Sequence, residues 1–334
     1  MLYFVITFLL SVVLTFLVRK VSLRFGIVDR PDGQRHLHAK PTALLGGVAI
    51  FASFWSVILY LILHNPVQGI DRIANSLGLA LLSSFIIMLI GIADDIRPFS
   101  ARARLGMVVV SILISSLYPW ISKITNPFGG YVEITELLSK VIVFFWFLGM
   151  TYTTKILDGL DGLATGIVSI GAFVIVLLTS VTKFYQPNVS LVSLVFLAAC
   201  LGFLVFNFYP AKIFLGESGS MFIGFMLAVL AIIGGGKLAT ALLVMAIPML
   251  DLLRVIFIRL RRKQPLFVGD REHLHFRLVD SGFSQRKTVI ILYVLSFLFG
   301  LTTLFLQSLQ KFYALLFLVV IMAILSHIIG KRKI

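Results

Sequence analysis

Cysteine and charged residues are scarce in this sequence of 334 residues. Its one cysteine, Cys200, lies in an apolar run and has no partner within the chain, which excludes a disulfide scaffold. Charged residues make up 13% of the chain and hydrophobic residues 59%, with a mean hydropathy of +1.05. These values lie outside the range of soluble globular domains, so the composition predicts a protein that lives mainly in lipid.

Apolar runs recur along the whole chain, and a membrane-spanning helix needs about 20 mostly apolar residues. We expect an all-α polytopic membrane protein with about 11 transmembrane helices, near 2–18, 46–63, 76–93, 105–121, 139–154, 163–182, 191–206, 221–236, 238–258, 288–307 and 312–329. Arg19 and Lys20 follow the first run rather than precede it, so we expect a retained helix and not a signal peptide. No connection is long enough for a soluble domain, which predicts one membrane domain over 1–334.

The positive charge of the chain, +15 at neutral pH, has an uneven distribution. With an odd number of crossings and the N-terminus outside, the inner segments hold 23 of the 29 Lys and Arg residues. Basic residues gather on the cytoplasmic side of membrane proteins, so we expect an outer N-terminus, a cytoplasmic C-terminus and no nucleic-acid partner. Eleven of the 14 acidic residues share the inner side, which the charge rule does not explain.

Three smaller features predict local structure. Residues 126–134 combine turn residues with alternation, as in a short hairpin. Pro248 should kink the ninth apolar run, and Asp251 and Arg254 are spaced to pair below the kink.

Five inner segments, 19–45, 94–104, 151–162, 207–220 and 259–287, combine polar clusters with the ends of apolar runs. In the first segment His38 and Lys40 precede a Gly-Gly helix start, a pattern that suits an anion, although basic inner loops are also the topological default. In the second segment Asp94 and Asp95 end an apolar run, where two carboxylates are costly; this favours a metal or proton-transfer role over that of solvated boundary residues.

The third segment contains the sequence Asp158-Gly-Leu-Asp161-Gly between two apolar runs. If it is helical, the two acids share a face, and the glycines let a ligand approach the backbone. Two acids and two glycines at this place have no packing role, so we interpret them as functional. In the fourth segment, which begins at Asn207, Glu217 lies between glycines and suits oxygen ligation of Mg²⁺, although the same residues could form a capped turn.

The fifth segment contains Arg271, His273, His275 and Arg277, a cluster suited to a diphosphate. The spacing of the two histidines also occurs in zinc sites, but no matching set of Cys or further His completes one.

The order of these segments resembles the polyprenyl-phosphate N-acetylhexosamine-1-phosphate transferases of the WecA/TagO type, and more distantly phospho-MurNAc-pentapeptide transferase. The resemblance runs from Asp29 to His275, and its most specific parts are the 158–162 motif, the segment after Asn207 and the sequence around His273. It implies a Mg²⁺-dependent enzyme, with Mn²⁺ as an alternative, at the cytoplasmic face of the inner membrane. The oxygen of undecaprenyl phosphate attacks the sugar-linked phosphorus of a UDP-N-acetylhexosamine, most commonly UDP-GlcNAc, and UMP leaves.

The resemblance also assigns roles by position. Catalytic roles fall on Asp94, Asp95, Asp158 and Asp161, metal ligation on Glu217, Asp161 and Asp94, and contacts with phosphates or substrate on the remaining candidates: Lys40, His38, Asn207, Lys155, Arg271, His273, His275 and Arg277.

The sequence departs from the family pattern at four positions. Lys155 and Tyr152 stand where the family usually has Asn, Glu217 where it has Asp, and Phe276 where it has a third histidine. The lysine ammonium would compete with a cation near Asp158 or stand in for one. These departures keep a second hypothesis open, a member that binds lipid phosphate or nucleotide sugar without turnover. A transporter is disfavoured because the apolar runs are nearly free of charge at their centres. A homodimer stays open.

Overall fold

The computed structural model describes residues 1–30, 41–64, 71–118, 120–126, 128–181, 185–234, 238–265, 271–306 and 308–331. Nearly all of these residues are helical. The helices are α1 (Leu2–Phe25), α2 (Gly46–His64), α3 (Asp71–Ile96), α4 (Ala101–Ser116), α5 (Glu136–Leu157), α6 (Leu163–Val181), α7 (Pro187–Asn207), α8 (Gly216–Ile233), α9 (Leu238–Val244), α10 (Ala246–Arg261), α11 (Leu274–Asp280), α12 (Gln285–Phe305) and α13 (Ser308–Lys331).

The chain is a polytopic membrane protein. In the described part, eight helices are long and apolar enough to cross a membrane, or up to nine if the bent pair α9–α10 forms one span. Each of the eleven expected runs coincides with a helix or with that pair, but α4 has only 16 residues and α13 contributes only a shorter apolar stretch, Leu309–Ile321.

Helix α8 lies at the centre of the bundle and packs against α2, α3, α5 and α6. All of its residues from Ser218 to Ile232 are buried. Phe222 and Phe225 lie edge-on or tilted against aromatic rings of neighbouring helices. A helix that is apolar all round is stable only inside such a ring of other helices, whereas α1, at the edge, exposes its apolar side chains as a lipid-facing helix does.

The expected kink near Pro248 is confirmed. The chain breaks at Met245, and α9 and α10 meet at an angle of 77°. Proline lacks an N–H group and fits the first turn of a helix, where that group has no partner. The break therefore lies just before Pro248, and Pro248 belongs to the first turn of α10.

Two short antiparallel ladders complete the described fold. The expected hairpin is confirmed as β3 (Lys123–Thr125) with β4 (Tyr131–Glu133), where the Lys123 ammonium lies 2.9 Å from the Glu133 carboxylate. The pair β1 (Val28–Asp29) and β2 (Thr42–Ala43) was not predicted, because strands of two residues show no alternation.

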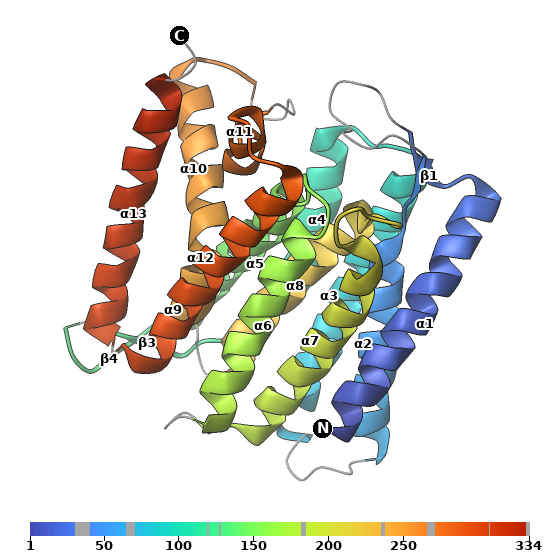
Figure 1. Ribbon diagram of the computed structural model, residues 1–334. Coiled ribbons are helices and arrows are strands. Elements are labelled where there is room, and N and C mark those ends of the chain that lie inside the picture. The colour runs from blue at the N-terminus through green and yellow to red at the C-terminus, as the bar shows by residue number, and fades with distance from the viewer. Residues whose placement is uncertain are drawn as a thin grey trace.

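The two ends of the bundle differ. Figure 1 shows β3 and β4 at the end that holds the N-terminus, whereas β1 and α11 lie at the opposite end, the end at which α13 finishes. The second end gathers the polar segments that the sequence singles out.

Glycines bring α8 into close contact with its neighbours at this end. A Cβ atom on Gly47 of α2 would lie 2.1 Å from the Gly219 Cα, and one on Gly91 of α3 would lie 2.2 Å from the Ser218 Cα. These approaches fix where the first turn of α8 stands relative to α2 and α3.

We expect Gly91→Ala to lower the unfolding temperature of the detergent-purified protein, because overpacking of this kind costs about 1–3 kcal/mol. Gly78→Ala is the matched control on the same helix, since a Cβ there meets nothing within 4 Å. Alanine favours a helix over glycine by about 1 kcal/mol, so the control should be as stable as the parent or more stable. Equal unfolding temperatures for the two variants would show that the contact does not matter.

Candidate active site

The five polar segments meet at one end of the bundle. The first segment joins the fourth where the backbone N–H of Phe214 donates to the Ala43 carbonyl, and the second joins the fourth through the contacts of Asp95 with the start of α8. The third touches the fifth, because a Cβ on Gly159 would lie 2.6 Å from the His275 Nε2. His38 and Lys40 lie outside the described residues.

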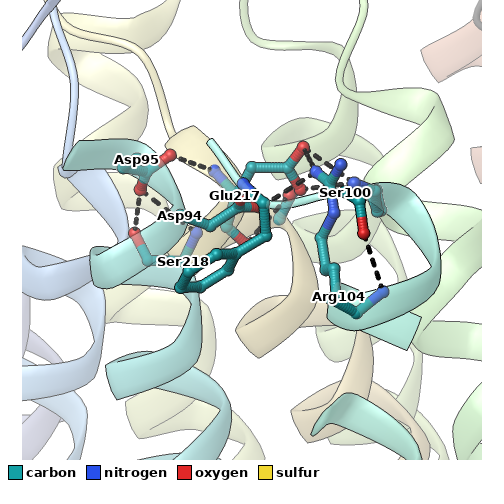
Figure 2. A network of polar contacts seen from close by, with 10 residues as sticks. Asp94, Asp95, Ser100, Arg104, Glu217 and Ser218 are labelled. Atoms are coloured by element: carbon teal, nitrogen blue, oxygen red, sulfur yellow. Dashed lines mark hydrogen bonds and ion pairs between the residues drawn. The ribbon is translucent and has the colours of Figure 1, made fainter. Parts of the chain in front are cut away.

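Asp95 caps the N-terminus of α8. Its carboxylate accepts hydrogen bonds from the backbone N–H of Glu217 at 2.7 Å, from that of Ser218 at 3.3 Å and from the Ser218 hydroxyl at 2.7 Å. Figure 2 shows these contacts beside Asp94. The start of a helix has free N–H groups and a positive dipole, which a carboxylate stabilises. The capped turn that the sequence allowed around Glu217 is therefore present, with its capping group supplied by α3.

Asp94 is 3% exposed and has its own partners. Its Oδ1 accepts a hydrogen bond of 2.6 Å from the backbone N–H of Phe99, and its Oδ2 lies 2.9 Å from an Arg104 guanidinium nitrogen. Arg104 stands in the first turn of α4, which the Ser100 hydroxyl caps by accepting from the Ala103 N–H. The two neighbouring acids thus hold two different helices, α8 and α4.

Glu217 lies between two cations. Its carboxylate contacts the same Arg104 nitrogen that reaches Asp94, and the Lys155 ammonium donates to Oε1 at 2.7 Å and to Oε2 at 2.6 Å. Lys155 belongs to the last turn of α5. Sequence reasoning assigned no role to Arg104, because a single arginine in a basic inner loop looks like part of the topology signal.

The 158–162 motif is a turn and not a helix. Helix α5 ends at Leu157, α6 begins at Leu163, and Gly162 has a φ of +76°. The conditional expectation that Asp158 and Asp161 share a helical face is therefore wrong. The backbone leaves the helix at Asp158, which has a φ of −75° and a ψ of 47°, before the chain reaches Asp161.

The two acids of this turn have different surroundings. Asp161 accepts a hydrogen bond of 2.9 Å from the backbone N–H of Ala211 and so ties the turn to the fourth segment. Asp158 forms no side-chain hydrogen bond or ion pair with any described residue. Burial, followed by the charges of Glu217, Asp95 and Asp161, raises the pKa of Asp158 well above its ordinary value. A cation bound beside it would relieve this repulsion.

Asn207 is buried and fixes the loop that follows α7. Its amide accepts from the Thr165 hydroxyl at 3.3 Å and donates to the Ile213 carbonyl at 3.1 Å. Because both ends of the amide bind protein and the residue is 2% exposed, Asn207 shapes the loop in this conformation and does not face a substrate.

The histidine segment is anchored by Asp251. The Asp251 Oδ2 lies 2.9 Å from the His273 Nδ1 and accepts the Leu274 N–H at 3.0 Å, while Oδ1 binds Arg254. The expected pair of Asp251 and Arg254 is thus confirmed, but the hold on His273 was not predicted. A carboxylate that accepts from one ring nitrogen fixes the tautomer and leaves Nε2 as an acceptor.

His275 is buried, and its Nε2 has no hydrogen-bond partner among the described residues. Its ring stacks with that of His273 at 5.8 Å between centroids. Burial, followed by the nearby His273, lowers the pKa of His275 to about 3. His275 is therefore neutral at pH 7, and the cationic character expected of this segment comes from its arginines.

The two arginines of the segment differ in their partners. Arg271 lies 2.6 Å from the Asp280 carboxylate and 5.2 Å from the centre of the Phe276 ring. The Arg277 guanidinium has no hydrogen bond or ion pair with any residue that the structure describes. Burial, followed by the charge of Arg254, lowers its pKa, so an anion at Arg277 would relieve an unfavourable environment.

The metal ligands expected from the resemblance were Glu217, Asp161 and Asp94. No group of three or more His, Cys, Asp or Glu side chains in the described part of the chain is arranged to hold a metal ion. Arg104 lies between Asp94 and Glu217, and Lys155 contacts both oxygens of Glu217. These two carboxylates therefore do not fit a shared metal in this conformation. Asp158, by contrast, forms no ion pair with a described residue.

Comparison with known proteins identifies the family. The model of glycosyl transferase family 4 matches residues 77–235. The chain is 31% identical over 337 residues to a probable undecaprenyl-phosphate N-acetylglucosaminyl 1-phosphate transferase of Bacillus subtilis, covering 98% of this chain and 90% of that protein. It is 32% identical over 309 residues to a decaprenyl-phosphate N-acetylglucosaminephosphotransferase of Mycobacterium tuberculosis, covering 83% and 75%.

A third relative is more distant but similar in extent. The undecaprenyl-phosphate alpha-N-acetylglucosaminyl 1-phosphate transferase of Yersinia pestis is 28% identical over 304 residues, covering 85% of this chain and 78% of that protein. The match to the Bacillus protein runs along nearly the whole of both chains and includes all five polar segments. The chain therefore belongs to glycosyl transferase family 4 and, within it, to the polyprenyl-phosphate N-acetylhexosamine-1-phosphate transferases.

Proposed function

We propose that this protein transfers N-acetylglucosamine-1-phosphate from UDP-GlcNAc to a polyprenyl phosphate such as undecaprenyl phosphate, and releases UMP. The observation that carries the proposal is the near full-length match to a relative named for this reaction. The site supports it, since cations and carboxylates from the second, third and fourth segments meet at the end of an apolar bundle, where a lipid phosphate and a nucleotide can meet.

The transfer is a displacement at phosphorus. An oxygen of the lipid phosphate forms a bond with the sugar-linked phosphorus, and the bond from that phosphorus to the oxygen of the UMP phosphate breaks. UMP leaves with the electron pair of the broken bond. Such reactions need positioning and neutralisation of oxygen charges more than covalent help from the protein.

We assign the described residues as follows. Arg277 binds a phosphate of the donor, and His273, held by Asp251, offers its Nε2 to the substrate. Asp158 would hold a Mg²⁺ or Mn²⁺ ion, which would supply positive charge to neutralise phosphate oxygens. Asp94, Asp95 and Asp161, assigned catalytic roles on sequence, position α4, the start of α8 and the loop at Ala211.

We also propose the topology. Eleven crossings, counting the pair α9–α10 once, put the N-terminus outside and the site at the cytoplasmic face of the inner membrane. The excess of basic residues in the inner segments and the position of the two termini at opposite ends of the bundle support this arrangement (Figure 1).

A second candidate is a member of the family that binds its ligands without turnover. The position of Lys155 favours this second candidate. Its ammonium contacts the Glu217 carboxylate, which the family resemblance assigns to metal binding. The Tyr152 hydroxyl, also at a departing position, is buried without a hydrogen-bond partner among the described residues. Phe276 stands at another position where the sequence departs from the family pattern, and the centre of its ring lies 4.3 Å from that of the His275 ring.

The two candidates differ in one assay. We expect the purified protein to release UMP from UDP-GlcNAc when polyprenyl phosphate and Mg²⁺ are present, and to release none without the lipid. A panel of UDP-N-acetylhexosamines tests activity and donor choice together, with UDP-MurNAc-pentapeptide as the donor expected to fail. Binding of donor without UMP release from any member of the panel would favour the second candidate.

Arg277→Gln should raise the KM for UDP-GlcNAc about tenfold or more, since a hydrogen bond to a charged group contributes about 1.5–3 kcal/mol. Arg286→Gln is the control, because Arg286 is an exposed arginine at the start of the neighbouring helix α12. UMP release over a range of donor concentrations measures both. An unchanged KM in Arg277→Gln would remove Arg277 from the donor site.

A further inference from the structure

The Lys155 ammonium contacts both oxygens of the Glu217 carboxylate. It lies 2.7 Å from one oxygen and 2.6 Å from the other, as a bidentate cation would. The Lys155 side chain is 17% exposed and that of Glu217 30% exposed, so water screens this pair only in part. Charge-assisted hydrogen bonds of this length are strong in such surroundings.

Arg104 completes the shell of Glu217 from the other side. One of its nitrogens reaches the Asp94 Oδ2 at 2.9 Å and also contacts the Glu217 Oε1. Figure 2 shows Arg104 reaching up from α4 toward the two acids. A Mg²⁺ ion needs carboxylate oxygens at about 2.0–2.1 Å in octahedral geometry, and at Glu217 both oxygens already contact a cation of the protein.

The charges around Lys155 match this arrangement. Lys155 and Arg104 together face the carboxylates of Glu217 and Asp94, two positive charges against two negative ones. The Lys155 ammonium therefore balances the Glu217 carboxylate, as a bound metal ion would. Asparagine at this position, the residue usual in the family, would supply no charge.

We propose that Lys155 is a built-in cation that takes the place of a divalent metal ion at Glu217, and that its ammonium neutralises the donor diphosphate on this side of the site. The first part concerns the protein without substrate. The second part rests on the proposed function, because it needs a diphosphate donor.

Binding of Mn²⁺ to the detergent-purified full-length chain, stripped of metal and without nucleotide, tests the first part. The electron paramagnetic resonance signal of free Mn²⁺ reports how much ion is taken up. We expect the parent to take up none at Glu217, and Lys155→Asn to bind one ion per chain at least about tenfold more tightly, because one opposing charge is gone.

Two variants serve as controls. Lys155→Arg keeps the charge and should still exclude Mn²⁺. Lys140→Asn removes the other lysine of α5, which pairs with Glu136 far from the site, and should behave as the parent does. An ion bound by the parent and lost in Glu217→Gln would overturn the proposal, and this comparison holds even if Lys155→Asn does not fold. A folded Lys155→Asn protein that binds no more Mn²⁺ than the parent would also overturn it.

UMP release tests the second part. Lys155→Asn should raise the KM for UDP-GlcNAc at saturating Mg²⁺, with partial recovery in Lys155→Arg. A rise in activity of Lys155→Asn over the parent would contradict the proposal and agree with a member of the family whose turnover has been lost. Absence of UMP release from parent and variants alike would remove the proposed function, while the Mn²⁺ measurement still decides the first part.

Discussion

The contact between the Asp95 carboxylate and the first turn of α8 is the interaction on which the site depends. It joins the end of one helix to the start of the most buried helix of the bundle, at a point where glycines bring the backbones of α2, α3 and α8 together. A carboxylate at a helix C-terminus is unfavourable by itself, but here it accepts hydrogen bonds from the free N–H groups of a second helix and stabilises the dipole of that helix. The cap also sets the place of Glu217, the second residue of α8.

Charge balance at the membrane edge follows from this placement. Once Glu217 stands beside Asp94, two carboxylates lie close together where water is limited, and a buried charge without a partner costs several kcal/mol. Arg104 and Lys155 supply the partners from α4 and α5. Asp158 and Arg277 form no ion pair with any described residue.

Much of the architecture could be predicted from the sequence, because a spanning helix must be apolar over its length. The apolar runs that form α2, α6 and α7 are examples, and Pro248 predicted the bend between α9 and α10. The pairing of β1 with β2 could not be predicted, since it rests on two residues from each strand. The 158–162 turn was not predicted, because i,i+3 spacing is compatible with a helix; the structure shows that the backbone leaves α5 at Asp158, whose ψ is 47°.

The polar segments were found from the sequence because acids at the ends of apolar runs are costly near lipid and stand out from the runs around them. The side chains that these polar residues contact could not be predicted from the sequence. The contacts of Asp251 with His273, and of Arg104 with Asp94 and Glu217, join residues far apart in the chain, and spacing carries no information about such pairs. Asn207 shows the reverse case, a residue chosen for a motif whose amide turns out to hold a loop.

The central claim is that the sugar moves together with its phosphate. The most direct measurement uses UDP-GlcNAc that carries a radioactive label on the sugar-linked phosphorus, with polyprenyl phosphate as acceptor and the purified protein as catalyst. The account predicts that the label passes into the lipid fraction while UMP is released without it. A label that stays with the nucleotide, released as UDP, would contradict the account, because the sugar would then have moved without its phosphate.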